Sequence, residues 1–416
     1  MRAKRGAPFA TLSFFALAAS GSMESLSYSD WSLEFHQRVA TRRVPLSASI
    51  ELTRRCNLRC VHCYNNLPLG HGPARRAELT LEEHCRILDE ITAAGCLWLL
   101  FTGGEILVRP DLLDIYTYAR RKGFLIALFT NGTLVTPAMA DFLAAHRPFS
   151  IEISLYGRTQ QTYERVTGVP GSYRRALEGI RLLADRGLPL TIKTMALTLN
   201  RHEIRDMKEF VETELGLNFK FDAMISPRID CSRGPLAVRL QPEQIVALDM
   251  QYPDRISEWK RFCDYFHGGV RDPKRKDALF DCGAGVQAFS IDPFGRLSPC
   301  LTWPGETYDL RCGSFQEGWE IFFQTLLDRK ATRQTQCRSC GIIDMCGMCP
   351  VNASLECRDP EAPVDFLCRV AHLRAYAMDI SVPPHGDCRY CPGGDQYDGM
   401  RKTAAALKSK RVEQRG

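Results

Sequence analysis

The segment that decides the fold is CNLRCVHCY, residues 56–64, which follows the short apolar run Ala48–Leu52. It holds three closely spaced cysteines, Cys56, Cys60 and Cys63. Three such thiolates can ligate three irons of one cubane cluster. Because a [4Fe–4S] cluster has four irons, the fourth is left open to an exogenous group. The alternatives are a zinc site completed by His62 and three buried thiols, and we favour the iron–sulfur cluster over both.

Around this segment, from residue 46 to about 225, short apolar runs alternate with amphipathic helical patterns. Six runs are predicted strands: Ala48–Leu52, Leu97–Thr102, Phe124–Thr130, Ser150–Leu155, Leu190–Ala196 and Phe219–Ala223. This alternation predicts parallel strands joined by right-handed crossovers. Six units are too few for a closed eight-stranded barrel. We therefore expect an α/β fold with a partial (β/α)6 barrel of the TIM type and a site at the C-terminal ends of its strands.

Three of the helical patterns carry signals at their ends. Leu81–Ala94 follows Thr80, a good N-cap residue. Asp111–Lys122 follows a proline that suits the first turn of a helix, and Tyr173–Arg186 stops at Gly187. These stretches are therefore predicted helices between the strands.

Two predicted strands end in residues that suit ligand binding. The second runs into Thr102-Gly103-Gly104-Glu105, whose paired glycines allow close approach of a ligand and whose carboxylate can hold an ammonium group. The fourth runs into Ser154-Leu155-Tyr156-Gly157. Four other residues near strand ends are either pocket walls or ordinary loop residues: Asn131, Gly132, Lys193 and Asn200.

The CxxxCxxC spacing with an aromatic residue directly after it resembles the signature of the radical S-adenosylmethionine (SAM) superfamily. The resemblance implies that the three cysteines ligate a [4Fe–4S] cluster whose open iron chelates SAM. One electron then cleaves SAM to methionine and a 5′-deoxyadenosyl radical. The resemblance also implies a set of SAM contacts: Tyr64 near the adenine, Gly103, Gly104 and Glu105 at the amino group, and Ser154 at the ribose.

Cysteine is the outlying residue of the composition, with 18 in 416 residues, most of them after residue 230. Such density indicates disulfides in a secreted chain and metal in a cytosolic one. The spacing over residues 282–368 resembles the SPASM domain, which appends two auxiliary iron–sulfur clusters to a radical SAM core. The resemblance implies a distal cluster on Cys337, Cys340, Cys346 and Cys368, and a proximal one on Cys282, Cys300 and Cys349. Zinc knuckles are the alternative for the paired CxxC spacings.

The roles of some cysteines stay open. The fourth proximal ligand is Cys312 as first choice and Cys263 as second, unless the position is left for substrate, and Cys357 competes with Cys368. The pair Cys388 and Cys391 either binds a further metal or consists of exposed tail thiols, and we expect the latter. Cys85 and Cys96 are expected to be buried apolar residues.

These patterns divide the chain into a leader or extension at 1–45, a radical SAM core at 46–230, a connecting region at 231–281, a SPASM domain at 282–375 and a tail at 376–416. From Cys282 onward we expect loops cross-linked by metal, with one helix near Gln316–Lys330, because the segment offers little hydrophobic core of its own. The basic end of the tail is expected to be partly disordered.

Residues 2–19 imitate a secretory signal, with a basic start and an apolar run. Since iron–sulfur clusters need reducing conditions, we expect an over-extended start or a disordered extension, with Met23 as a candidate for the true start, and a cytoplasmic protein. No other stretch is long and apolar enough for a membrane span. The positive charge gathers at the two ends, so no nucleic-acid surface is expected.

Proteins with this resemblance, such as the pyrroloquinoline quinone and mycofactocin maturases, modify ribosomally made peptides by cross-linking, oxidation or epimerisation. We therefore expect a peptide maturase that takes electrons from a flavodoxin or ferredoxin. Any leader-peptide binder should be a separate protein, because about 45 residues before the barrel are too few for such a domain.

The rivals are oxidative decarboxylation of a tetrapyrrole, sulfatase maturation, and an electron-transfer protein without radical chemistry. Sulfatase maturation is weakened because Leu301 and Gly283 stand where those enzymes carry an aspartate after a cysteine. The Gly104-Glu105 motif argues against a mere electron carrier, which needs no SAM pocket.

Overall fold

The computed structural model describes residues 28–39, 42–267, 277–280 and 282–413. The expected leader up to Met23 lies outside the described residues. Helix α1 (Tyr28–Val39) belongs to one compact unit, and Arg42–Gly416 form another. Within α1, Trp31 stacks on Phe35 with ring centroids 5.4 Å apart. The sheet and the cysteine groups lie in the second unit.

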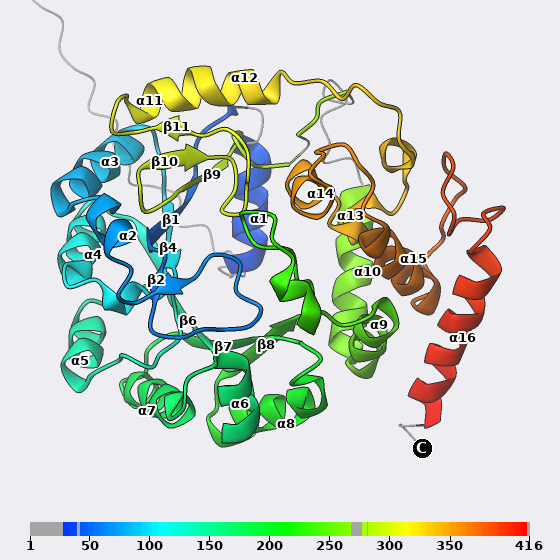
Figure 1. Cartoon of the computed structure of the whole chain (residues 1–416), viewed down its shortest axis with the longest axis horizontal. Coiled ribbons are helices and arrows are strands. Elements are labelled where there is room, and N and C mark those ends of the chain that lie inside the picture. Colours follow the sequence, from blue (N-terminus) through cyan, green and yellow to red (C-terminus); the bar gives the residue numbers. More distant parts are fainter. Residues whose placement is uncertain (1–27, 40–41, 268–276, 281, 414–416) are drawn as a thin grey trace, which may run out of the picture. The chain divides into compact units, whose positions relative to one another are not determined.

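Six neighbouring parallel strands form the barrel part of a nine-stranded sheet (Figure 1). They are β1 (Ser47–Thr53), β4 (Trp98–Gly103), β5 (Leu125–Thr130), β6 (Ser150–Ser154), β7 (Leu190–Met195) and β8 (Asn218–Asp222). Each pairs in parallel with the next in that order. The six predicted strands and the partial (β/α)6 barrel are therefore confirmed, with ends that shift by one residue.

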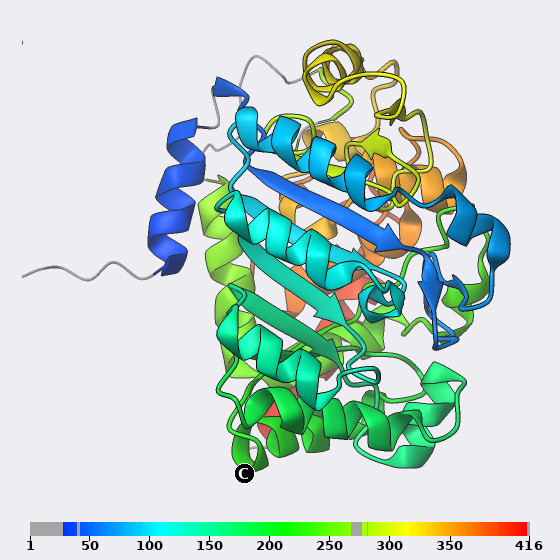
Figure 2. The same ribbon diagram turned by 90° about the vertical axis from the view of Figure 1, so that its left-hand side faces the viewer.

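Helices connect these strands and cover one face of the sheet, as Figure 2 shows. They are α3 (Leu81–Ala93), α4 (Leu112–Arg121), α5 (Pro137–Ala145), α6 (Gln160–Thr167), α7 (Ser172–Ala184) and α8 (Ile204–Glu209), the last continued by η4 (Phe210–Glu214). Thr80 caps α3 in a full capping box with Glu83, as its sequence predicts. Between sheet and helices lies the main core, which includes Leu52, Phe101 and Ile153.

Short elements fill the loops of the barrel. They are β2 (Arg55–Cys56), β3 (Leu67–Pro68), α2 (Gly72–Ala77), η2 (Ile106–Val108), η3 (Arg201–Glu203) and η5 (Gly234–Val238). Strands β2 and β3 pair in parallel directly after β1, so they frame the segment that holds the three cysteines.

Beyond β1 the sheet continues into the cysteine-rich region. Strand β9 (Ala288–Ile291) pairs in parallel with β1, and β10 (Arg296–Ser298) and β11 (Tyr308–Asp309) follow antiparallel. The expected helix near Gln316–Lys330 is present as α11 (Phe315–Glu317), η7 (Gly318–Phe322) and α12 (Phe323–Leu327).

The expectation of loops with a single helix after Cys282 is wrong. Besides the three strands, the region contains η8 (Gln336–Ser339), α13 (Ile343–Cys346), α14 (Pro350–Cys357), α15 (Asp365–Ala377) and α16 (Tyr397–Glu413). The expectation of a partly disordered basic tail is also wrong for residues 397–413, because α16 packs on α15 and buries Met400 and Ala404.

A second apolar cluster explains both differences. It joins α9 (Pro242–Gln251) and α10 (Pro253–His267) to the C-terminal helices through residues such as Val246, Met250 and Met345. Since the connecting region supplies part of this core, the C-terminal region does not rely on metal alone. Among the described residues, no helix is long and apolar enough to cross a membrane.

Candidate functional site

The three cysteines of residues 56–64 lie at the C-terminal end of β1, where the barrel mouth was expected. Cys56 is buried, and Cys60 and Cys63 are half-buried. Backbone hydrogen bonds hold the loop against the end of α6: the Arg59 amide donates to Thr167 (2.8 Å) and the Val61 amide to Val166 (3.0 Å). The thiols are thus carried on a backbone that the barrel fixes.

The surroundings of these thiols suit an iron–sulfur cluster. Burial, together with the nearby Glu105 and Cys63, raises the pKa of Cys56 to about 12. The amide of Leu58 donates to the Cys56 sulfur at 3.3 Å, and the Asn131 side chain does so at 3.8 Å. Burial disfavours free thiolates, whereas a bound metal cluster stabilises them. N–H donors to the sulfurs tune the reduction potential of such a cluster.

Donor spacing separates a cluster from a single zinc ion. Tetrahedral zinc brings its sulfur and nitrogen ligands within about 3.3–3.8 Å of one another. In the described part of the chain, one group of at least three His, Cys, Asp or Glu donors is this compact, within 4.8 Å, and it includes neither Cys56, Cys60 and Cys63 nor His62. The three cysteines are therefore spread more widely than one zinc ion requires.

The paired glycines of the second strand pack against the chain that leads into the cysteines. The Gly104 amide donates to Thr53 (2.7 Å) and the next amide to Arg55 (3.0 Å). A Cβ at Gly103, where φ is +134°, would lie 2.1 Å from the Thr53 carbonyl oxygen, and one at Gly104 would lie 2.4 Å from that of Arg55. Glycine is required here by a close backbone approach, which sets the position of the cysteine loop.

Glu105 links two strand ends. It is fully buried, and burial raises its pKa. One carboxylate oxygen accepts from the Thr130 hydroxyl (2.7 Å) and the Leu107 amide (3.0 Å), and the other accepts from the Asn131 amide (2.7 Å). The side chain therefore ties the end of β4 to the end of β5, beside Cys56.

Tyr64 contacts a buried carboxylate that sequence reasoning missed. Its hydroxyl donates to Glu51 at 2.8 Å, and the Asn65 side chain also donates to Glu51. Burial raises the pKa of Glu51, and Arg54 opposes that rise at 3.3 Å. An acidic residue inside the apolar strand Ala48–Leu52 was the available signal, because a buried charge needs partners.

Ser154 lies at the end of β6, next to a group of aromatic residues under the cysteine loop. Tyr156 contacts His62 edge-on, with ring centroids 4.6 Å apart. Burial raises the pKa of Tyr156, with Cys60 adding to the rise and a hydrogen bond to Ser154 opposing it. Two buried polar atoms here have no hydrogen-bond partner among the described residues, His62 Nδ1 and Tyr163 Oη. Orphaned buried atoms of this kind are what a site built around a further group contains.

Three other residues near strand ends are held by hydrogen bonds or an ion pair. Arg228 donates to the carbonyls of Cys63 (3.2 Å) and Asn66 (3.1 Å). Asn200 donates to the Tyr156 carbonyl at 3.1 Å. Lys193 pairs with Glu152 at 3.2 Å, and burial lowers the Lys193 pKa to about 8.

The structure gathers the C-terminal cysteines into two groups. In one, Cys337 and Cys368 share a hydrogen bond that raises the Cys337 pKa, and Cys346 and Cys340 lie close by. In the other, the thiol of Cys349, which also accepts from the Asn352 amide at 3.4 Å, lies near two more cysteines, Cys282 and Cys300. The two groups match the two sets that the resemblance implies.

The remaining cysteines lie elsewhere. Cys312 is exposed after β11, where its amide donates to Asp309, and Cys357 is exposed at the end of α14. The side chain of Cys263 lies outside the described residues. Cys96 is buried as expected, and Cys85 is half-buried.

The expectation that Cys388 and Cys391 are exposed thiols is wrong, because both are buried. The cause is again the helical packing of the tail, which encloses the segment between α15 and α16.

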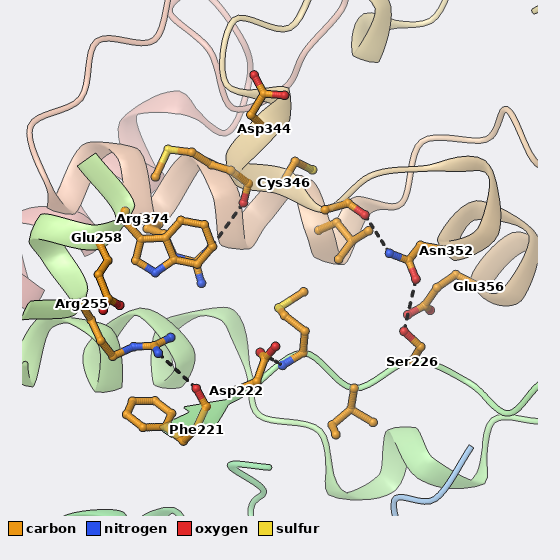
Figure 3. Close-up of a pocket in the computed structure, with 16 residues that line it drawn as sticks. Phe221, Asp222, Ser226, Arg255, Glu258, Asp344, Cys346, Asn352, Glu356 and Arg374 are labelled. Carbon is orange, nitrogen blue, oxygen red and sulfur yellow. Dashed lines mark hydrogen bonds between the residues drawn. The ribbon is translucent and has the colours of Figure 1, made fainter. Parts of the chain in front are cut away.

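A cavity of about 470 Å³ lies between the end of β8 and the C-terminal helices (Figure 3). Asp222 and Ser226 line one side, and Cys346, of the first cysteine group, lines the other. Residues 222–228 thus run from this cavity to the cysteine loop, where Arg228 is anchored. The cavity is large enough to bury a side chain or small ligand.

Comparisons with known proteins agree with this geometry. Residues 50–211 match the model of the radical SAM superfamily. The Fe-coproporphyrin III synthase of Methanosarcina barkeri is 33% identical over 71% of this chain and 80% of its own length. The mycofactocin maturase MftC of Mycolicibacterium smegmatis is 28% identical over 88% of this chain and 91% of its own. SuiB of Streptococcus suis, bound to its precursor peptide SuiA, has a TM-score of 0.61 at 16% identity over 86% of this chain and 85% of its own, which shows a shared fold.

The chain belongs to the radical SAM superfamily. It is a radical SAM enzyme, of a family that uses a [4Fe–4S] cluster and SAM, and its relatives include peptide maturases of the SPASM type.

Proposed function

We propose that this enzyme modifies a ribosomally made peptide by cross-linking, oxidation or epimerisation. The observation that carries the proposal is the similarity to MftC, which extends over 88% of this chain and 91% of MftC. The fold shared with peptide-bound SuiB supports the same reading of the architecture.

In this proposal Cys56, Cys60 and Cys63 hold the catalytic cluster. When bound there, SAM supplies a 5′-deoxyadenosyl radical that removes a hydrogen atom from the substrate. The contacts to SAM come from the residues that converge on the loop: Tyr64, Gly103, Gly104, Glu105 and Ser154. Arg228 holds the loop through the Cys63 carbonyl, and Glu105 acts from the other side by fixing Asn131, whose side chain donates to the Cys56 sulfur.

The auxiliary clusters occupy the two C-terminal groups. Cys337, Cys340, Cys346 and Cys368 hold the distal one, and Cys282, Cys300 and Cys349 hold the proximal one, with Cys312 or the substrate as fourth ligand. The cysteine spacing over residues 282–368, which resembles that of the SPASM domain, supports iron–sulfur clusters over zinc knuckles.

The charge of the cavity favours a peptide over a tetrapyrrole. Four carboxylates line it, on Asp222, Glu258, Asp344 and Glu356, of which Glu356 is ion-paired with Arg239, against two arginines, Arg255 and Arg374. Both arginines already bind Asp249, each with a nitrogen–oxygen distance of 2.9 Å. A tetrapyrrole with several carboxylates would meet like charge here, whereas a neutral or basic peptide segment would not.

Oxidation of a tetrapyrrole is the second candidate. Two observations favour it: the 33% identity to the Fe-coproporphyrin III synthase, and a heme synthase of Methanosarcina barkeri that is 27% identical over 94% of its own length.

The experiment that separates the two measures 5′-deoxyadenosine from anaerobic, cluster-loaded enzyme with SAM and a chemical reductant. One arm adds short peptides encoded beside the gene, and the other adds iron coproporphyrin. We expect a rise of at least tenfold with one peptide and a mass change in that peptide. A rise with the porphyrin and with no peptide would contradict the proposal.

Partners and location follow from this chemistry. The proposal includes a flavodoxin- or ferredoxin-type electron donor, a separate leader-peptide-binding protein and a reducing compartment, the cytoplasm, because the thiol clusters must stay reduced.

A further inference from the structure

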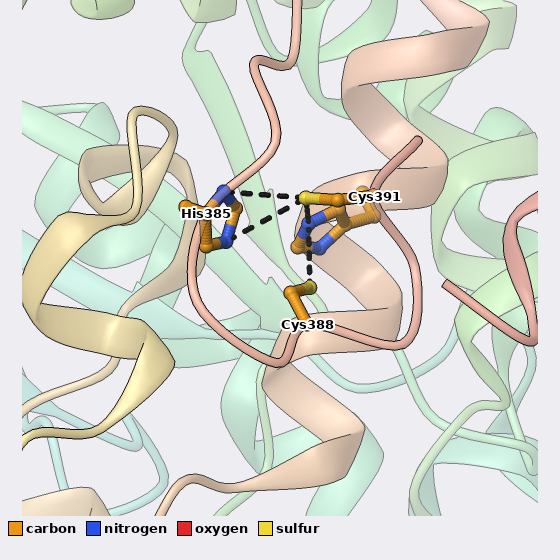
Figure 4. Close-up of side chains that lie close together, drawn as sticks. His385, Cys388 and Cys391 are labelled. Carbon is orange, nitrogen blue, oxygen red and sulfur yellow. Dashed lines mark hydrogen bonds between the residues drawn. The ribbon is translucent and has the colours of Figure 1, made fainter. Parts of the chain in front are cut away.

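Four metal-binding side chains meet at a place that the radical chemistry does not use. His372 lies on α15, and His385, Cys388 and Cys391 lie on the segment that leads from α15 to α16 (Figure 4). All four are buried, with exposed fractions of 1%, 6%, 5% and 2%. One donor atom from each lies within 4.8 Å of all the others.

The distances match the edges of a tetrahedron around one metal ion. The His372 Nε2 atom lies 3.4 Å from the sulfur of Cys388 and 3.4 Å from that of Cys391. The Cys391 sulfur lies 3.2 Å from His385 Nδ1 and 3.7 Å from His385 Nε2. Zinc bonds of about 2.3 Å to sulfur and 2.0–2.1 Å to nitrogen give donor separations of about 3.3–3.8 Å.

The other ring nitrogen of His372 faces a backbone carbonyl, with His372 Nδ1 2.8 Å from the Cys368 oxygen. If this Nδ1 carries the hydrogen and donates it there, His372 Nε2 keeps its lone pair toward the thiols. His385 has its ring beside Cys391, and its Nδ1 lies near both the Cys391 sulfur (3.2 Å) and the Pro383 oxygen (3.0 Å). Metal-binding histidines are oriented by such a bond in nearly every case.

We propose that His372, His385, Cys388 and Cys391 bind one zinc ion, as a site separate from the iron–sulfur clusters. Four protein ligands close the coordination shell, so the role is structural rather than catalytic, and zinc does not change its oxidation state. The ion fastens residues 385–391 to α15 and thereby orders the connection to α16.

The position of this site gives it a second consequence. Cys368 lies one helical turn before His372 on α15, and its carbonyl receives the His372 bond. Cys340 also lies near Cys388. The zinc site therefore borders the distal cysteine group and supports the helix that carries one of its members.

The test measures zinc and iron together in the anaerobically purified full chain. We expect about one zinc per chain in addition to the iron, and a zinc X-ray absorption spectrum with two sulfur and two nitrogen neighbours. The double variant Cys388→Ser/Cys391→Ser should lose at least 80% of the zinc and keep most of the iron. The matched control is Cys357→Ser, an exposed cysteine of the same region, and it should keep both metals.

Two results would overturn the proposal. One is wild-type protein with full iron and less than about 0.2 zinc per chain, a measurement that does not depend on any variant folding. The other is a double variant that loses iron and not zinc, because that would assign Cys388 and Cys391 to an iron–sulfur cluster.

Discussion

Glu105 shows how one side chain can shape a site without standing free in it. Its two oxygens accept three hydrogen bonds, from Thr130, Leu107 and Asn131, in a fully buried position. The Gly-Gly-Glu motif pointed to Glu105 as a SAM contact. The three hydrogen bonds give it a structural role that the motif does not predict. The carboxylate sets the distance between two strand ends, and Asn131 at one of them donates to the Cys56 sulfur.

Replacing Glu105 with glutamine should damage the site more than its size suggests. The amide NH₂ would face either the Asn131 amide or the Leu107 amide, so a buried donor loses its acceptor at a cost of about 1–3 kcal/mol. We expect SAM cleavage to fall at least tenfold and the melting temperature to drop. The control, Glu82→Gln, changes an exposed carboxylate on α3 and should leave both quantities unchanged. Wild-type activity in Glu105→Gln would contradict this role.

Arg228 permits a parallel test from the other side of the loop. Arg228→Met removes the bonds to the carbonyls of Cys63 and Asn66. We expect the iron of the catalytic cluster to be lost several times faster on exposure to a chelator, followed by absorbance. Arg233→Met, at an exposed position of the segment after β8 that also holds Arg228, should lose iron at the wild-type rate.

Lys193 should make stability depend on pH. Its folded pKa of about 8 lies below the ordinary value of 10.5, so between these values the unfolded chain binds a proton that the folded chain does not. The free energy of unfolding should therefore rise with pH from about 8 to 10.5, by on the order of 3 kcal/mol. Below pH 8 Lys193 is charged in both states, so the full destabilisation from burying its charge is present. Anaerobic denaturation of wild type and Lys193→Met should show this rise in the wild type alone, and equal slopes would refute it.

At the scale of elements, the sequence predicts those features that depend on residues close to one another along the chain. The six barrel strands and Thr80 as a helix cap depend on neighbours in sequence, and the structure confirms them. Strand β9 has four residues and exists because it pairs with β1, about 240 positions earlier. The compact group around His372 has the same origin, since α15 folds back against the segment that follows it. Apart from the closely spaced pair Cys388 and Cys391, through-space pairing of this kind leaves no local pattern.

Helix α16 makes the clearest prediction for an element. Met400 is 9% exposed and packs into the second apolar cluster. Met400→Ala should lower the free energy of unfolding by about 2–4 kcal/mol, because it leaves a cavity. Thermal unfolding followed by circular dichroism measures the change. Lys402→Ala, exposed on the same helix, should cost less than about 0.5 kcal/mol, and equal costs for the two variants would mean that α16 is not packed.

For the molecule as a whole, the barrel and the cysteine-rich region share one sheet. Strand β9 extends the sheet from β1, and Arg54, next to the cysteine loop, reaches Asp292 after β9 at 3.3 Å. Asn352, which follows Cys349, also contacts Ser226 after β8. The three cysteine groups are therefore held by one connected framework, which suits electron transfer from a substrate radical to an auxiliary cluster.

The most direct test of the central claim is an anaerobic count of iron and sulfide together with SAM cleavage under a reductant. Wild type and a Cys56→Ala/Cys60→Ala/Cys63→Ala variant would be compared. Three clusters predict about twelve irons per chain, at about four per cubane. In the variant we expect about eight irons and no 5′-deoxyadenosine. A wild type with about four irons would remove the auxiliary clusters, and a wild type with neither iron nor SAM cleavage would contradict the account.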